Sequence, residues 1–227
     1  MTNKAKFVKL WILDSRYIAS SVLHSLIFRK PHHSFTAKHL SKDPVVLIPG
    51  ITQKWNAFRK LIPALVKDGH PVYTVPALRR NHMPVKDGAA QVRQVIEKHN
   101  LQNVVLIGLS KGGIVGRYTL SFLNPDDRIK KFIALSAPFA GTHVARLMPF
   151  RSYREMIPSS KTITLLNNQN HHNHKITSVF GTYDNAVIPL ESSRLEGAKN
   201  IQVNIEGHAR IVFDDNSIKT ILAEVNN

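Results

Sequence analysis

The sequence predicts an α/β fold in which a mostly parallel sheet is covered by helices on both faces. Short apolar runs alternate along the chain with segments whose apolar residues recur at helical spacing. This alternation is typical of parallel sheets, because parallel strands are joined by crossovers that usually contain a helix. With 227 residues, 43% of them hydrophobic, the chain can bury one sizeable core, so we expect a single such domain.

The amino-terminal segment, residues 1–30, is predicted as a helix that precedes the main domain at residues 31–227. Between Phe7 and Phe28 it holds many apolar residues, but Lys9, Asp14, Arg16 and His24 interrupt them. The segment lacks the roughly 20 apolar residues that a bilayer-spanning helix needs, and it has no clear signal-peptide cleavage site. Two interpretations stay open, an amphipathic helix packed on the domain and a basic helix lying on a membrane surface. We expect a cytoplasmic protein, with peripheral membrane contact as an option.

Six segments are predicted as strands because each is short, largely apolar and rich in β-prone residues. They are residues 45–48, 71–75, 103–107, 131–135, 176–180 and 201–205. The last of them alternates apolar and polar residues, which is typical of an edge strand. We therefore expect a minimal six-stranded sheet.

Four helices are predicted from apolar residues at helical spacing. They are residues 55–68, 85–100, 111–123 and 217–225. In the first of them Phe58, Leu61 and Leu65 share one face, and Gly69 supplies a stop. The third ends before Pro125, because proline cannot continue a helix. The first three helices each connect two predicted strands.

The pentapeptide Gly108-Leu109-Ser110-Lys111-Gly112 has the pattern G-x-S-x-G and lies between a predicted strand and a predicted helix. A strand that turns abruptly into a helix imposes strained backbone angles on the serine, and side chains at the flanking glycine positions would collide with neighbouring backbone. The serine then projects alone above the edge of the sheet. This context makes Ser110 a candidate catalytic nucleophile.

The acid and the base of a catalytic triad are sought after later strands, in the order nucleophile, acid, histidine. Asp184 comes soon after the predicted strand 176–180 and is the candidate acid. His208 follows the last predicted strand and is the candidate general base. Three rival acids fit the chain order or the spacing less well: Asp214, Asp215 and Glu206.

Acyl transfer through a serine also needs two preorganised backbone N–H groups that stabilise the oxyanion of the tetrahedral intermediate. The residue after the nucleophile supplies one, which makes Lys111 a candidate. The other is expected in the turn after the first core strand, where Pro49-Gly50-Ile51 follows residues 45–48. Ile51 is the candidate donor, and Gly50 allows the backbone to approach a substrate closely.

These motifs together resemble the alpha/beta-hydrolase family, and within it the small bacterial lipases and esterases with little or no lid. The resemblance covers roughly residues 44–210. It rests on five stretches: Pro49-Gly50-Ile51, Gly108-Leu109-Ser110-Lys111-Gly112-Gly113, Ser136-Ala137-Pro138-Phe139-Ala140-Gly141-Thr142, Gly181-Thr182-Tyr183-Asp184 and Gly207-His208. Two positions depart from the family pattern. Many members have His-Gly where this chain has Pro49-Gly50, and Lys111 puts a charge near the acyl site where Met, Gln or Leu is common.

Residues 138–175 form the longest insertion between predicted strands, and the resemblance implies that such a region builds an acyl pocket or a lid. Apolar residues such as Leu147 and Phe150 are interspersed with Arg146 and Arg151. This mixture could wall an acyl pocket and meet an anionic interface. The alternative is a helical excursion that packs on the core.

The composition limits the partners and cofactors of the chain. Without cysteine, disulfides, thiolate metal sites and cysteine nucleophiles are excluded. His171, His172 and His174 lack the ligand spacing of a metal site, and no phosphate-binding loop is present, so we expect neither a metal nor a cofactor.

The charge of the chain favours polyanionic partners. It holds 31 Lys and Arg against 15 Asp and Glu, a formal net charge of +16, which attracts polyanions such as anionic phospholipid surfaces. The basic residues are dispersed along the whole chain, and no zinc finger, RNP-like aromatic set or helix-turn-helix signature indicates a specific nucleic-acid partner.

The sequence thus predicts a serine hydrolase of carboxylic esters, and the resemblance and the basic surface favour lipid acyl esters as substrates. In this mechanism Ser110 attacks the ester carbonyl, His208 takes its proton and Asp184 orients the imidazole. Phospholipase, thioesterase and acyltransferase activities share this machinery and stay open. A non-enzymatic protein that binds lipid or polyanion on a hydrolase scaffold is the alternative from another class.

Overall fold

The computed structural model of the protein describes residues 41–148 and 150–227, together with residues 8, 10–12, 14, 16 and 34–36. Within this part of the chain, seven strands form one sheet in the order β1-β3-β2-β4-β5-β6-β7. The strands are β1 (Ser34–Phe35), β2 (Val45–Ile48), β3 (Val72–Thr74), β4 (Val104–Leu109), β5 (Ile129–Leu135), β6 (Ile176–Phe180) and β7 (Lys199–Gln202). All neighbouring pairs are parallel except β1 and β3. The predicted α/β class is confirmed.

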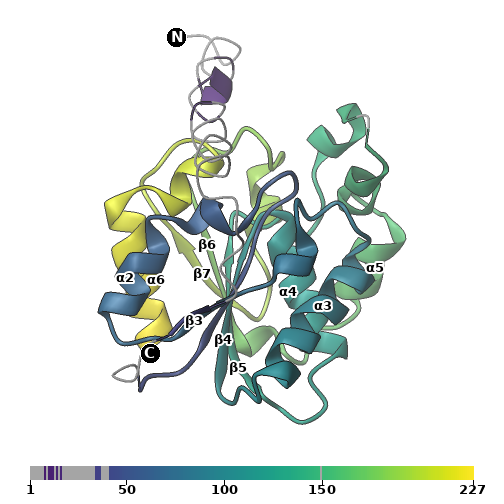
Figure 1. Ribbon diagram of the computed structural model, residues 1–227. Helices are drawn as coiled ribbons and strands as arrows, with labels where there is room; N and C mark the ends of the chain where they lie inside the picture. Colours follow the sequence, from purple (N-terminus) through teal and green to yellow (C-terminus); the bar gives the residue numbers. More distant parts are fainter. Residues whose placement is uncertain are drawn as a thin grey trace.

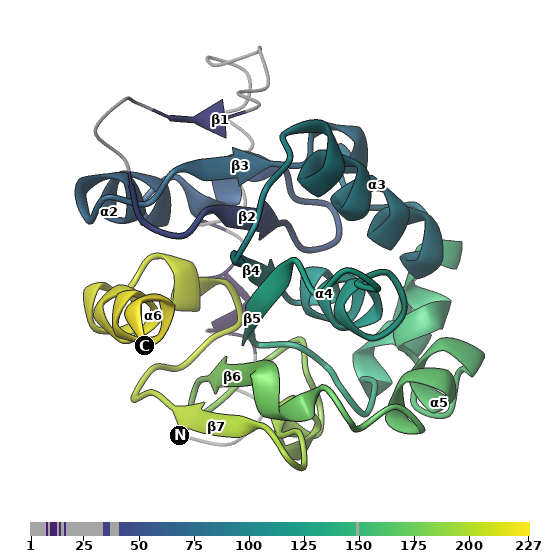
Figure 2. The same cartoon turned by 90° about the horizontal axis from the view of Figure 1, so that it is seen from below.

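Helices cover both faces of the sheet. They are α2 (Leu61–Lys67), α3 (Val85–Lys98), α4 (Lys111–Phe122), α5 (Lys161–Asn167) and α6 (Asp215–Asn226). Helices α3, α4 and α5 lie on one face, and α2 and α6 lie on the other (Figure 1, Figure 2). Because successive strand residues point to opposite faces, Leu106 of β4 joins one hydrophobic core and Val105 joins the other.

Short 3-10 helices connect these elements. They are η1 (Trp55–Phe58), η2 (Pro76–Leu78), η3 (His143–Leu147), η4 (Arg151–Met156), η5 (Asn173–Lys175), η6 (Leu190–Ser193) and η7 (Ala209–Val212). The insertion at residues 138–175 therefore contains η3, η4, α5 and η5, and it joins β5 to β6. In the part of the chain that the structure describes, no helix combines the length and the apolar character needed to cross a membrane.

The sheet has one strand more than the six predicted. The additional strand β1 has two residues and pairs antiparallel with β3, where Ser34 faces Tyr73 and Phe35 faces Val72. A two-residue strand is too short to show any periodicity, so only the pairing partner reveals it.

The last predicted strand, 201–205, is wrong in its position. Strand β7 covers Lys199–Gln202 instead, because it pairs in parallel with β6, so that Thr177 faces Lys199 and Phe180 faces Gln202. Beyond β7 the chain leaves the sheet, and it returns only at a parallel bridge between Tyr183 and Glu206.

The predicted helix 55–68 is divided into η1 and α2. Pro63 explains the division, because it has no N–H to donate to the carbonyl group of Arg59 and its ring would clash with that group in a continuous helix. Proline is tolerated in the first turn of α2, where a backbone N–H would have no partner in the helix.

Of the predicted amino-terminal segment, residues 8, 10–12, 14 and 16 are helical. The other residues of 1–30, and with them the boundary at residue 30, lie outside the described residues. The division of the chain into residues 1–30 and 31–227 stays a prediction.

Candidate active site

Ser110 occupies a sharp turn between β4 and α4. Its backbone has φ +54° and ψ −119°, a conformation that residues other than glycine rarely adopt. The flanking glycines leave no room for a side chain. A Cβ atom on Gly108 would overlap the carbonyl oxygen of Gly112, and one on Gly112 would overlap that of Ile48. The turn therefore has the strained strand-to-helix geometry that the pentapeptide predicts.

Asp184 and His208 form a hydrogen-bonded pair beyond the ends of β6 and β7. His208 Nδ1 lies 2.8 Å from Asp184 Oδ2, while Asp184 Oδ1 accepts from the backbone N–H groups of Ala186 and Val187 at 2.8 and 2.9 Å. Burial lowers the pKa of His208, but the charge and the hydrogen bond of Asp184, with the charge of Asp14, outweigh burial and leave this pKa above its ordinary value. The pair therefore favours the protonated imidazole.

Two of the rival acids are engaged elsewhere. Asp214 Oδ2 accepts from the backbone N–H of Ser217 at 2.9 Å and so caps the amino-terminal end of α6. Asp215 lies 3.6 Å from Lys60 Nζ and has an exposed side chain. The bond to His208 Nδ1 belongs to Asp184, as the chain order predicts.

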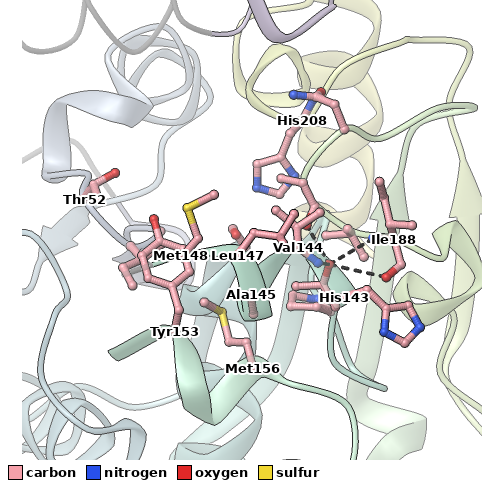
Figure 3. A pocket seen from close by; sticks show the side chains of 18 of the residues that line it. Thr52, His143, Val144, Ala145, Leu147, Met148, Tyr153, Met156, Ile188 and His208 are labelled. Carbon is pink, nitrogen blue, oxygen red and sulfur yellow. Dashed lines mark hydrogen bonds between the residues drawn. The ribbon is translucent and has the colours of Figure 1, made fainter. Parts of the chain in front are cut away.

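Ser110 and His208 line the same cavity, which has a volume of about 700 Å³. Its remaining wall is largely apolar, and the insertion supplies a large part of it. There Leu147, Met148 and Tyr153 border the same space as His208 (Figure 3). The insertion thus contributes to a cavity at the candidate nucleophile, as expected for residues 138–175. The Ser110 hydroxyl and the His208 imidazole thus lie in a largely apolar wall, which also holds polar side chains such as Thr142 and His143.

The turn that contains Ile51 lies beside the nucleophile. A Cβ atom on Gly50 would be 3.3 Å from Ser110 Cβ, and Ile51 itself lines the cavity. The backbone N–H of Thr52 donates to the carbonyl oxygen of Arg80 at 2.7 Å, which ties the turn to the loop after β3. Among the described residues, the backbone N–H groups of Ile51 and Lys111 have no hydrogen-bond acceptor.

The side chain of Lys111 does not line the cavity. Its ammonium group donates to the carbonyl oxygens of Asn81 and Met83 at 3.2 and 2.7 Å, and the side chain is fully buried. Burial lowers the pKa of Lys111 to about 8, against an opposing effect of the Glu155 charge. Carbonyl oxygens before α3 therefore hold the ammonium group, and Lys111 is not among the residues that line the cavity.

Two parts of the cavity wall were not predicted from the sequence. Ala186, Val187 and Ile188 follow the acid, and Trp11 and Asp14 come from the amino-terminal segment. The first group could have been predicted from the position of the acid. The loop that follows the acid starts at the carboxyl ends of the strands and therefore lies beside the site. No local pattern marks the second group, whose contacts join opposite ends of the chain.

The described residues contain no group of three or more His, Cys, Asp or Glu side chains that could hold a metal ion. In the histidine-rich stretch at 171–174, which lacks the ligand spacing of a metal site, the rings of His171 and His172 pack against each other with centroids 4.1 Å apart.

A sequence comparison identifies a family and one short relative. The sequence model of the family described as alpha/beta hydrolase fold matches residues 43–159, about half of this chain. A Mycoplasma pneumoniae protein named as an esterase/lipase is 51% identical over 41 residues, which are 18% of this chain and 15% of that protein. The matched stretch is therefore only a small part of that relative.

Solved structures resemble the whole fold. The mature Bacillus licheniformis lipase BlEst2 has a TM-score of 0.72 at 15% identity, with 86% of this chain and 99% of that chain covered. Aspergillus fumigatus lipase B has a TM-score of 0.66 at 15% identity, with 86% and 56% covered. A monoacylglycerol lipase from Paleococcus ferrophilus has a TM-score of 0.60 at 16% identity, with 85% and 95% covered. At these identities the likeness is one of fold.

Proposed function

This chain belongs to the alpha/beta hydrolase fold family, and on that premise we propose that it hydrolyses carboxylic esters, with lipid acyl chains as the acyl group. One observation carries the proposal. Ser110 at its strained turn and His208, which is bonded to Asp184, line a single apolar cavity. A nucleophile, a base and an orienting acid are the parts that acyl transfer through a serine requires.

The chemistry proceeds in two halves. Ser110 Oγ bonds to the ester carbonyl carbon while its proton moves to His208 Nε2, the ring nitrogen that Asp184 leaves available. When the tetrahedral intermediate collapses, the carbon–oxygen bond to the alcohol breaks and His208 returns the proton to that alcohol. Water then attacks the acyl-enzyme, gives a proton to His208, and the acid leaves as Ser110 regains its hydrogen.

The pKa of His208 supports this role. A base whose protonated form is favoured by Asp184 accepts the serine proton more readily than an isolated imidazole. The oxyanion that forms at the carbonyl oxygen would bind the backbone N–H groups of Ile51 and Lys111. Both belong to backbone fixed by the neighbouring turn and helix, so they need no rearrangement during the reaction.

The cavity wall supports an apolar acyl group. The lining residues around Ser110 include Val144, Met156, Val187 and Ile188, whose side chains offer dispersion contacts and no fixed charge. A cavity of about 700 Å³ lies within the usual range of ligand pockets and can take a chain of several methylene groups. Burial of each methylene contributes roughly 0.8 kcal/mol, so longer chains gain affinity until the cavity is full.

We also propose that the mouth of this cavity faces an anionic lipid surface, from which the substrate enters. Among the described residues, six of the seven large exposed apolar side chains come from two segments that border the cavity: Val8, Trp11, Ile12, Leu147, Met148 and Phe150. The same segments carry exposed cationic side chains: Arg16, Arg146, Arg151 and Arg154. Exposed apolar side chains that share their segments with arginines are complementary to a bilayer with negative head groups.

The test is hydrolysis of p-nitrophenyl esters from acetate to palmitate by the wild type and by Ser110→Ala. We expect turnover that increases with chain length to a maximum and that Ser110→Ala abolishes. Labelling of Ser110 by a fluorophosphonate should accompany this turnover. Activity of Ser110→Ala at the wild-type level would contradict the proposal.

The cavity itself can be tested with a filling substitution. Ala145 is buried in the cavity wall, so Ala145→Trp should shift the preferred ester to a shorter chain. Leu165→Trp is the matched control, since Leu165 is exposed and does not line the cavity. If no ester is hydrolysed but a fluorophosphonate still labels Ser110, a thioester or an acyl acceptor other than water becomes the substrate to test. Absence of both reactions would favour a protein that binds lipid without reacting.

A further inference from the structure

A carboxylate from the amino-terminal segment holds the backbone at the candidate base. Asp14 Oδ2 accepts a hydrogen bond from the backbone N–H of His208 at 2.7 Å, and Asp14 Oδ1 accepts one from that of Ala209 at 3.1 Å. The two ends of this contact are 194 residues apart in the chain. Asn185, next to the candidate acid, shares the His208 N–H at 3.1 Å. The backbone of the base is thus fixed from two other segments.

The place of these bonds explains why a carboxylate suits them. His208 precedes η7 as its N-cap residue, and its own side chain makes no capping hydrogen bond. The first N–H groups of a helix have no partner within the helix and carry partial positive charge, which an acidic group satisfies. Asp14 supplies that group from a distant part of the chain. His208 can therefore use its side chain for Asp184 and the cavity.

Gly207 makes room for this approach. Its backbone has φ +106°, and a Cβ atom there would lie 3.0 Å from Asp14 Oδ1. A side chain at this position would strain the backbone and crowd the carboxylate. The residue before the base is thus matched to a carboxylate that comes from outside its own loop.

Asp14 is buried beside the base, and its charge has no Lys or Arg partner within the described residues. Its side chain is 3% exposed and lines the cavity, as does Trp11 one helical turn earlier. Burial raises the pKa of Asp14, while the charge of His208 and the two backbone N–H groups lower it in opposition. Asp184 at Nδ1 and Asp14 at the backbone are the charges that raise the pKa of His208. Other titratable side chains nearby are His143, Arg146 and Tyr153 in the cavity wall and Glu206 and Arg210 on the segment of His208 itself.

From these contacts we infer that Asp14 is a positioning residue of the active site, which fixes the backbone of His208 and stabilises its imidazolium. The inference rests on the proposed function, because it assigns His208 the role of the base. It makes the amino-terminal segment a part of the catalytic unit, with Trp11 as wall and Asp14 as support. A positioning error of about 1 Å at a base can cost roughly 100-fold in rate.

The test compares Asp14→Asn with Asp14→Glu and with Asp87→Asn, the same substitution at an exposed position of α3. In Asp14→Asn we expect kcat for a p-nitrophenyl ester to fall about 10- to 100-fold with KM nearly unchanged. Asp14→Glu keeps the charge and should recover part of the activity, and Asp87→Asn should match the wild type. Rates are referred to active sites titrated with a fluorophosphonate, so that unfolded protein does not count.

A second measurement follows the imidazole directly. The pKa of His208 is measured by NMR titration of its ring, assigned with His208→Gln. We expect it to be lower by about half to one pH unit in Asp14→Asn than in the wild type. Wild-type kcat and an unchanged His208 pKa in Asp14→Asn would overturn the inference, as would a loss of stability alone. If the proposed function is wrong, the wild type itself will not hydrolyse the ester. In that case the change in the His208 pKa alone tests the inference about Asp14.

Discussion

Asp184 Oδ2 and His208 Nδ1 are 2.8 Å apart, although 24 residues separate the two side chains in the chain. The pairing of parallel strands explains this distance. Strands β6 and β7 are neighbours, and the bridge between Tyr183 and Glu206 restores their pairing just before the two residues. Each therefore leaves the sheet at the same edge, one beside the other.

Replacement of Asp184 should show how much its orientation of His208 contributes to turnover while the Ser110 nucleophile is kept. Asp184→Asn keeps the shape of the side chain but changes the charge and the hydrogen bond to His208, so we expect kcat to fall by up to about 10⁴ while the fold is retained. The matched control is Asp215→Asn, at an exposed position 3.6 Å from Lys60. If kcat fell less than about tenfold in Asp184→Asn and fell more in the control, Asp184 would not be the acid of the triad.

The pH dependence of kcat/KM should report the raised pKa of His208. The base must be neutral to take the serine proton, so activity should increase with pH through a midpoint above about 6.5, the ordinary value of histidine. In Asp184→Asn burial still lowers the pKa while the opposing charge is absent, so the midpoint should move to lower pH. The measurement is kcat/KM from pH 5 to 9 at constant ionic strength. Identical midpoints in the two proteins would refute this coupling.

The glycine at the start of α4 should be irreplaceable. A Cβ atom on Gly112 would overlap the carbonyl oxygen of Ile48, so Gly112→Ala should lower the free energy of unfolding by at least about 2 kcal/mol and impair turnover. The control is Gly88→Ala in α3, where the nearest side-chain atoms are 3.4 Å away and a helical alanine gains up to about 1 kcal/mol. Urea unfolding of both variants gives the comparison. Equal stabilities would mean that the turn relaxes around the new methyl group.

The buried Lys111 should make stability depend on pH. Its pKa of about 8 in the folded protein is below its ordinary value of 10.5, so between these values the unfolded chain binds more protons and stability increases with pH. The free energy of unfolding of the wild type, minus that of Lys111→Met, should therefore rise by about 1 kcal/mol per pH unit from pH 8 to 10.5. Lys86→Met, at an exposed position, controls for the lost charge. A flat difference for Lys111→Met would mean that the lysine stays charged throughout.

Local patterns in the sequence determined most of the scaffold and the place of Ser110. Apolar runs predicted β2 and β6 with their observed bounds, and the pentapeptide predicted a strained turn because its glycines are needed within a few residues of the serine. The chain order also predicted the pairing of Asp184 with His208, since parallel strands end at a common edge. Neighbouring residues encode the strands and the turn. The general rule that parallel strands end at a common edge encodes the pairing.

Tertiary structure alone decided the features that depend on distant partners. The two-residue strand β1 exists only by pairing with β3, and the direction of the Lys111 side chain follows from carbonyl oxygens some 30 residues earlier. The contact of Asp14 with His208 joins opposite ends of the chain. No local pattern encodes such contacts, because a buried polar group takes whichever partner the packing brings within hydrogen-bond distance.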